Sequence, residues 1–438
     1  MSLVVIRLAA ATVVVWFALI SERPRADQDW HNLAVASFDE AWQTINDSYF
    51  DPTFGGVNWR QVRADLAPKV VSAETPDQAR AVIRDMLARL GQSHFALLAA
   101  SATEPPPGPA SVPVDVRLIR DEVIVTGVEQ DSAAWRAGLR PGDALVAVDG
   151  VSTRAMVGAV GDRTALVTAW RRVVHALHGP DRSVARIDVA ASRPNGNRSV
   201  TTLSVPRRRE SGELVAVGNL PPMLVRSQVR AMKTPASRSV GVIGFNVWMT
   251  AVTAPFAAAI DAYRDSDGLV IDLRGNPGGL AEMIRGLSGH LLDEPALLGR
   301  MRMRGVELEF RANPRRSTDD GRRVIPFSGP VAILVDELTG SASECFAGAL
   351  QSLGRARVFG ATTMGQALPA VTRRLSNGDV LLYAIGDFVT STGQRLEGRG
   401  VIPDEAVPMS VQALAAGHDA ALDAALLWID RTRSRRAQ

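Results

Sequence analysis

The feature that most constrains the fold is an alternation of apolar strands and helices that begins at residue 239. The segments "SVGVIGFNV" and "GLVIDL" are expected to form strands on either side of the helical stretch "TAPFAAAIDAYRD". The later segments "VAILVD", "ARVFGA" and "DVLLYAIGDFV" predict further strands, with helices in "LAEMIRGLSGHLL" and "SECFAGALQSLG" between them. Strands that alternate with helices indicate a layered α/β domain with parallel pairing. We expect this core domain over residues 207–430.

The chain before the core has a different pattern in each of its parts. In "TPDQARAVIRDMLARL", Thr75 is a candidate helix cap and Pro76 suits the first helical position, so residues 27–100 are expected to be a helical region. The proline-rich "ATEPPPGPASVP" predicts a linker at residues 101–110. Residues 111–206 are expected to form short strands around one helix.

The first residues are strongly apolar. An unbroken run from Leu8 to Ile20 follows Arg7 and precedes charged residues, and its length is typical of a signal-peptide core. We expect residues 1–26 to be a signal peptide or an uncleaved anchor, with membrane association through residues 3–20. The predicted location is exported: periplasmic, or anchored in the membrane and facing outside the cytoplasm.

Composition excludes some partners. The net charge is +3 over 438 residues, and no basic block interleaved with aromatic residues stands out, so nucleic acid is not an expected partner. Cys345 is the single cysteine, which excludes an internal disulfide and a cysteine-rich metal site. No metal or organic cofactor is predicted.

The middle region carries a recognisable motif. The stretch "DSAAWRAGLRPGDALVAVDG" resembles a PDZ domain of the bacterial protease type, in which a short helix, this turn and a strand recur in that order. The resemblance implies that the edge of its sheet takes up a peptide as an added strand. The alternative is a structural spacer without a ligand.

Ser341 lies at the polar tip of "ELTGSASECFAGAL", between a predicted strand and a predicted helix. Ser341 and Glu344 fit a capping box, in which the hydroxyl and the carboxylate each bind a backbone amide. Alternatively, Ser341 is a nucleophile, which requires a base, an orienting partner and an oxyanion site near the same hydroxyl. The loop "DLRGNPGG" is a candidate oxyanion site through Gly278 and Gly279, and the amide of Ala342 is a second candidate donor.

The order of "GLVIDLRGNPGG", "VAILVDELTGSASECFAGALQSLGRARVFGATTMG" and "EGRGVIPD" resembles the tail-specific (carboxyl-terminal processing) serine peptidase family. The resemblance implies a crotonase-like layered α/β core that carries a helical region and an inserted PDZ-like β domain. It also places the nucleophile on Ser341.

One branch of this family uses a Ser–Lys dyad, but Gln366 occupies the lysine position here, and an amide is not basic. A second branch, similar to the tricorn protease core, uses a Ser-His pair and a later glutamate, which match Ser93-His94 and Glu397 in "LEGRGVIPD". The resemblance implies that His94 is the general base and that Glu397 acts through Ser93. The alternative for Glu397 is an ion pair with Arg395 or Arg399.

These patterns predict a serine endopeptidase that cleaves unfolded or peptide-like chains through an acyl-enzyme, from a C-terminus recognised by the PDZ-like domain. The expected partners are protein or peptide substrates. Two alternatives stay open: an inactive peptide-binding scaffold of the same fold, and an esterase or amidase that uses the same residues.

Overall fold

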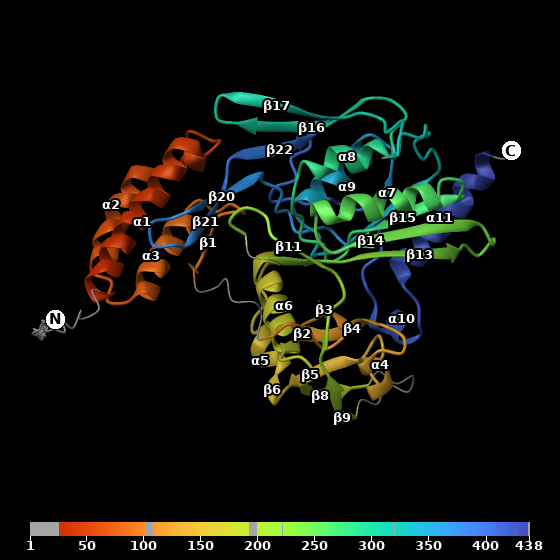
Figure 1. The fold of residues 1–438 in the computed structure, drawn as a ribbon, viewed down its shortest axis with the longest axis horizontal. Helices are drawn as coiled ribbons and strands as arrows, with labels where there is room; N and C mark the ends of the chain where they lie inside the picture. The colour runs from red at the N-terminus through yellow and green to blue at the C-terminus, as the bar shows by residue number, and fades with distance from the viewer. Residues whose placement is uncertain (1–25, 101–107, 192–198, 221, 319, 437–438) are drawn as a thin grey trace, which may run out of the picture.

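The computed structural model describes residues 26–100, 108–191, 199–220, 222–318 and 320–436. The predicted export segment lies outside these ranges apart from its last residue, as does most of the predicted linker. No helix within the described ranges combines the length and the hydropathy that a membrane crossing requires. Figure 1 shows an N-terminal group of helices, a β-rich unit below and a larger α/β core.

The N-terminal helices form a small layer with its own apolar core, built around Phe38, Trp59 and Ile83. Thr75 caps the third helix as predicted, because its hydroxyl accepts from the Gln78 amide at 3.2 Å. A short strand then joins this layer to strands from the far end of the chain. The elements are α1 (Ala26–Ser48), α2 (Trp59–Val71), α3 (Pro76–Ala88) and β1 (Ala96–Leu98), which pairs with β21 (Val380–Ala384), itself paired with β20 (Ala370–Arg374).

The middle unit is an antiparallel sheet in the order β3-β4-β5-β8-β9, with β6 beside β5, so β3 is an edge strand. Its strands are β3 (Val114–Ile119), β4 (Glu122–Val128), β5 (Ala144–Val148), β6 (Val151–Ser152), β8 (Val184–Ala190) and β9 (Val200–Pro206). Three helices belong to this unit, where the sequence predicted one: α4 (Ala133–Ala137), α5 (Thr153–Val157) and α6 (Arg163–Leu177). A small sheet beside it joins β2 (Ala110–Ser111), β7 (His178–Gly179) and β10 (Arg208–Arg209).

The core sheet has the order β13-β14-β15-β18-β19-β23 and is parallel as predicted, except that β13 is an antiparallel edge. Its strands are β13 (Ser227–Lys233), β14 (Ser239–Phe245), β15 (Gly268–Asp272), β18 (Val331–Val335), β19 (Arg357–Gly360) and β23 (Glu405–Ala406). The helices of the core are α7 (Thr253–Ala262), α8 (Met283–Gly289), α9 (Ala342–Ser352), α10 (Val411–Ala415) and α11 (Ala420–Arg436).

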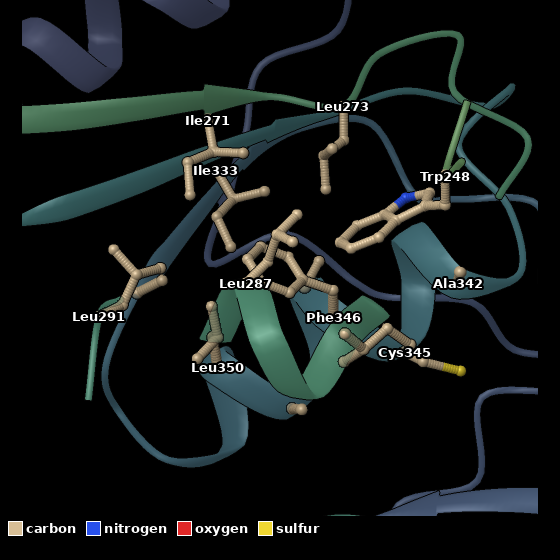
Figure 2. Close-up of a cluster of buried hydrophobic side chains, with 14 of the residues drawn as sticks. Trp248, Ile271, Leu273, Leu287, Leu291, Ile333, Ala342, Cys345, Phe346 and Leu350 are labelled. Atoms are coloured by element: carbon tan, nitrogen blue, oxygen red, sulfur yellow. The ribbon is translucent and has the colours of Figure 1, made fainter. Parts of the chain in front are cut away.

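Helices cover both faces of this sheet. On one face of the sheet, Ile271 and Ile333 belong to an apolar cluster that also contains Trp248 and Phe346 (Figure 2). Helices α7, α8 and α9 contribute the other side of this cluster. Neighbouring strand residues such as Val270 point to the other face, where α11 packs. The central strands are therefore apolar on both sides, which is typical of parallel strands under two helical layers.

Three expectations for the core need correction. The segment "DVLLYAIGDFV" is two strands in different sheets, because the chain turns at Ile385 between β21 and β22 (Gly386–Thr390). The helix expected over 280–292 is only seven residues long in α8. The hairpin of β16 (Ala296–Met303) and β17 (Val306–Ala312), which lies along the top of the core in Figure 1, was not predicted, because mostly exposed side chains on β17 hide its strand pattern.

Candidate active site

Ser341 lies at the start of α9, after the turn that follows β18. Its backbone has φ of +52° and ψ of −119°, a conformation that non-glycine residues adopt only when their surroundings hold it. Two acceptors hold the Ser341 amide: the carbonyl of Gln366 at 2.8 Å and the carboxylate of Glu344 at 3.0 Å. The surrounding structure therefore fixes the backbone in a shape that a cap does not require.

His94 comes from the front of the chain, just before β1, and also has a positive φ of 60°. Its Nε2 lies 3.3 Å from the Ser341 hydroxyl, and its Nδ1 lies 2.7 Å from the Ser93 hydroxyl. The pairing of β1 with β21, with Ala96 opposite Leu382, brings this segment to the core. Two side chains 247 positions apart in the sequence thus meet at hydrogen-bonding distance.

Glu397 completes a chain of polar contacts behind the imidazole. Its carboxylate accepts from the Ser93 hydroxyl at 2.9 Å, the Ser93 amide at 2.9 Å and the Ala367 amide at 2.7 Å. Among the described residues, Glu397 forms neither of the alternative ion pairs with Arg395 and Arg399, and the Arg395 guanidinium binds Asp387 at 2.7 Å. The structure therefore brings together Ser341, His94, Ser93 and Glu397.

These contacts define the tautomer of His94. The hydroxyl of Ser93 has one proton, and it donates that proton to the carboxylate of Glu397. Ser93 must therefore accept from Nδ1–H of His94, which leaves Nε2 of the neutral ring without a proton and facing the Ser341 hydroxyl. This arrangement can take a proton from Ser341.

Burial of the imidazole lowers the pKa of His94 to about 4. Removal from water disfavours the charged ring. The ring is consequently neutral at pH 7, which is the state that accepts a proton.

The expectation for the oxyanion site needs one correction. The Gly278 amide donates to the side-chain carbonyl of Asn276 at 3.0 Å, so it is not available to a substrate carbonyl. A Cβ on Gly278 would lie 2.5 Å from the Cβ of Ser341, so glycine is needed there for close approach. The amides of Gly279 and Ala342 have no acceptor among the described residues, and Ala342 follows Ser341 directly.

Glu344 has a larger role than the capping box indicated. Its side chain is fully buried, and its carboxylate accepts from the Ser341, Gly365 and Gln366 amides and from the Thr363 hydroxyl. Burial raises the pKa of Glu344 to about 7, although these four donors favour the charged form. The SxxE spacing was the only sequence signal for this residue.

Gln366 contributes to the site through its main chain. Its carbonyl holds the Ser341 amide, and the next amide, that of Ala367, holds Glu397. The peptide between Gln366 and Ala367 therefore joins the nucleophile to the carboxylate. No side-chain base is required at this position.

Cys345 lies on α9 within the apolar cluster of Figure 2 and is buried. Burial raises the pKa of this thiol well above its ordinary value, so it stays protonated and is a poor nucleophile. In the described part of the chain, no group of His, Cys, Asp and Glu side chains could hold a metal ion.

Comparisons with known proteins agree with this architecture. Residues 239–407 match the model of peptidase family S41, residues 36–88 match the tricorn protease C1 domain, and residues 124–161 match the PDZ domain. A "Carboxyl-terminal-processing protease" of Synechocystis sp. is 25% identical over 388 residues, which cover 86% of this chain and 81% of that protein.

Two solved structures share the fold. The photosystem II D1 C-terminal processing protease has a TM-score of 0.54 and 24% identity, and the match covers 89% of this chain and 98% of that one. Mature CPAF has a TM-score of 0.59 and 15% identity, and the match covers 92% of this chain and 96% of the CPAF chain.

The fold and the matched segments define a serine-type peptidase with a PDZ domain. The chain is similar to peptidase family S41 over residues 239–407 and to a carboxyl-terminal-processing protease over 86% of its length.

Proposed function

We propose that this chain is a serine endopeptidase in which Ser341 is the nucleophile and His94 the general base. The observation that carries this assignment is the distance of 3.3 Å between the Ser341 hydroxyl and Nε2 of His94, with Ser93 and Glu397 aligned behind the ring. Such distances are often somewhat long before a substrate binds.

Acylation begins when Oγ of Ser341 attacks the carbonyl carbon of the scissile peptide and its proton passes to Nε2 of His94. The imidazolium then gives this proton to the leaving amine as the C–N bond breaks, and an ester to Ser341 remains. A water molecule attacks the ester carbon and gives a proton to Nε2 of His94, and the imidazolium passes this proton to Oγ of Ser341 as the ester C–O bond breaks, which releases the second product as a carboxylic acid. The enzyme returns to its starting state.

The carboxylate of Glu397 stabilises the imidazolium through the Ser93 hydroxyl. Its charge compensates the proton that Nε2 gains, and its bond to Ser93 holds the tautomer that leaves Nε2 free. The burial that lowers the pKa of His94 also strengthens this interaction, because charges act more strongly away from water.

The developing oxyanion is bound by the Ala342 and Gly279 amides. Both come without a protein acceptor in the described structure, and the glycine loop packs directly against Ser341 through Gly278. One donor of this kind is typically worth about 10²–10³ in rate.

The substrates we propose are unfolded or peptide-like protein chains, because the relatives are named as carboxyl-terminal-processing proteases and a PDZ domain accompanies the peptidase core. Two further elements of the proposal rest on sequence and topology. The apolar residues 3–20 support export to the periplasm or anchoring facing outward. The parallel sheet with α7, α8 and α9 on one face and α11 on the other supports a crotonase-like layering of the core.

Labelling with a serine-directed fluorophosphonate tests the proposal. The wild-type chain should be labelled, and Ser341→Ala should not be. Equal labelling of both proteins, or none of the wild type, would contradict it. Turnover of a casein-like protein compared with a small ester separates a peptidase from an esterase, and peptide binding without turnover by the full chain would favour the inactive scaffold.

A further inference from the structure

A cavity of about 790 Å³ lies between the PDZ-like unit and the core. The edge strand β3 and the helix α6 line it from the PDZ-like unit, and β13 with the start of α11 lines it from the core. Its volume falls within the range that is typical of ligand-binding pockets, so it can hold the last residues of a peptide. The charged and apolar side chains on its walls therefore indicate which chain end it accepts.

The backbone at the start of β3 decides which groups can bind a terminal carboxylate. In a PDZ domain, backbone amides beside the edge strand usually capture it. Here the Val112 amide donates to the carbonyl of Leu177 at 3.1 Å, and the Val114 amide donates to the carbonyl of Val112 at 2.8 Å. Pro113, between them, has no N–H. A carboxylate at this end of the cavity therefore needs donors from side chains.

Arginine side chains can supply these donors. Seven arginines line the cavity, and five of them already bind acceptors of the chain itself, as Arg226 binds Glu210. Among the described residues, the guanidinium groups of Arg208 and Arg230 have no hydrogen-bond or ion-pair partner, and both residues are exposed. A guanidinium offers two parallel N–H groups to one carboxylate. These two arginines are therefore available to a ligand.

Strand pairing places Arg208 beside the start of β3. This residue lies on β10 opposite Ser111 of β2, which is three residues before Val114. Arg230 lies on β13, in the wall that the core contributes. Arg208 thus brings a free positive charge to the point where the backbone amides are already used, and Arg230 adds a second one from the core.

Acidic side chains also line the cavity, and they restrict the kind of ligand. Arginines of the chain bind four of these acidic residues: Glu210, Asp272, Asp336 and Asp419. Three others have no guanidinium partner among the described residues: Asp115, Glu129 and Glu337. Their negative charges oppose a ligand that carries several carboxylates, because like charges at close range repel each other. A single carboxylate at the end of an otherwise uncharged segment fits these walls better than an acidic segment does.

Apolar side chains line the cavity where β3 begins and α6 ends. Val114 on β3 and Val174 on α6 are half-buried and face the cavity, and Leu177 lies beside them. The contact between the Val112 amide and the Leu177 carbonyl holds these two elements together at this point. Such a surface favours an apolar side chain, because burial removes apolar area from water. We therefore expect the last residue of a bound chain to be apolar.

We propose that this cavity binds the C-terminal end of a substrate chain, with the terminal carboxylate on the guanidinium of Arg208 and with Arg230 attracting it from the core. Side-chain guanidinium groups thus take the place of the backbone amides of a PDZ groove. The cavity adjoins the active-site loops, because Asp336 in its wall accepts from the Gly275 amide, in the glycine loop beside Ser341, at 2.8 Å. The inference rests on the proposed function, since the chain that is bound here is the one that Ser341 cleaves.

Three forms of one unstructured peptide test this proposal, each with a quenched fluorophore pair around the cleaved bond. The first ends in alanine and valine with a free carboxylate, the second ends in the same residues with a C-terminal amide, and the third ends in aspartate with a C-terminal amide. With the full chain, kcat/KM for the free acid should exceed that for either amide at least fivefold. A smaller preference over the second peptide would overturn the proposal. Equal cleavage of the first and third peptides would also overturn it, because the cavity would then bind any negative charge.

Binding provides a readout that does not depend on catalysis. In anisotropy titrations of Ser341→Ala, the free acid should bind at least fivefold more tightly than the second peptide, and addition of Arg208→Met should remove this difference. Equal affinities of Ser341→Ala for the two peptides would refute the proposal. Failure of the proposed function would show instead as absent fluorophosphonate labelling of the wild type, which leaves the binding comparison valid.

Substitution of the two arginines tests their assignment. Arg208→Met should lower kcat/KM for the free acid to within about twofold of the second peptide, and Arg230→Met should reduce the preference at least twofold. Arg208→Lys keeps the charge but loses the planar fork, so it should retain part of the preference. Arg172→Met is the matched control, because this α6 arginine lies outside the cavity and donates to the Met156 carbonyl at 3.4 Å. A full preference in Arg208→Met, or its loss in Arg172→Met, would contradict the assignment, and thermal unfolding checks that each variant is folded.

Discussion

Replacement of Glu397 by glutamine tests the hydrogen-bond chain behind the catalytic imidazole. The carboxylate only accepts, so the Ser93 proton points to Glu397 and the proton of the neutral ring sits on Nδ1 of His94. In Glu397→Gln, the new amide N–H₂ can donate to Ser93 instead. The Ser93 hydroxyl then donates to Nδ1, which places the ring proton on Nε2, where it faces Ser341.

The size of the effect follows from this change of tautomer. Where a carboxylate contacts the imidazole directly, its replacement by an amide lowers kcat by about 10⁴, because the ring then adopts the wrong tautomer. Here the effect should be smaller, because the Ser93 hydroxyl lies between Glu397 and His94. In addition, the Ala367 amide donates to Oε2 of Glu397, so it favours the variant's amide oxygen over its N–H₂ at this position. We therefore expect kcat/KM to fall by about 10²–10⁴, which corresponds to about 3–5 kcal/mol in the barrier.

The assay is the rate of fluorophosphonate labelling together with hydrolysis of a quenched peptide at pH 7. Glu405→Gln is the matched control, since this carboxylate pairs with Arg357 at 3.6 Å on the surface and both side chains are 40% exposed. Thermal unfolding should be nearly the same for the two variants. If Glu397→Gln, correctly folded, keeps a third or more of the wild-type labelling rate, the assigned tautomer is wrong.

Four further outcomes are expected. His94→Ala should lower the acylation rate by at least about 10³. Gln366→Ala should lower it less than tenfold, because Gln366 contacts Ser341 and Glu344 through its main chain. Equal losses in a labelling assay would contradict these different roles of His94 and Gln366. Because the pKa of His94 is lowered from 6.5 to about 4, the neutral ring persists as the pH falls, so the acid limb of kcat/KM should lie below pH 6; a midpoint near 6.5 would exclude a buried base. The same shift makes the folded state lose stability as the pH falls from 6.5 through about 4, which urea unfolding at several pH values will show for the wild type and less for His94→Ala. Glu344→Ala leaves the Gly365 and Gln366 amides and the Thr363 hydroxyl without this acceptor, at about 1–3 kcal/mol each, so its free energy of unfolding should drop by about 3 kcal/mol or more. A drop under about 1 kcal/mol in urea titration would argue against that network.

Much of the core could be predicted because its signals are local. The buried strands β15 and β18 are continuous apolar runs, and Thr75 with Pro76 marks the start of a helix in the sequence itself. The β16–β17 hairpin could not be predicted, because its stability comes from pairing with β22 and not from an apolar pattern of its own.

The candidate site was also predictable only in part. Ser341, His94, Ser93 and Glu397 were identified from motifs that resemble a known family, and the structure places them in contact. The roles of main-chain groups were not accessible to sequence reasoning. Glycine composition suggested two free amides in one loop, but the Gly278 amide is taken by Asn276, a contact that depends on how the loop folds back.

The pairing of β1 with β21 has a consequence for the life of the polypeptide. His94 is synthesised early, Ser341 follows 247 residues later, and Glu397 comes 304 residues after Ser93, which it binds. A ribosome-bound chain therefore holds an inert imidazole until nearly its last strand has emerged. If the proposed mechanism holds, we expect the chain to gain proteolytic activity only when its synthesis is nearly complete.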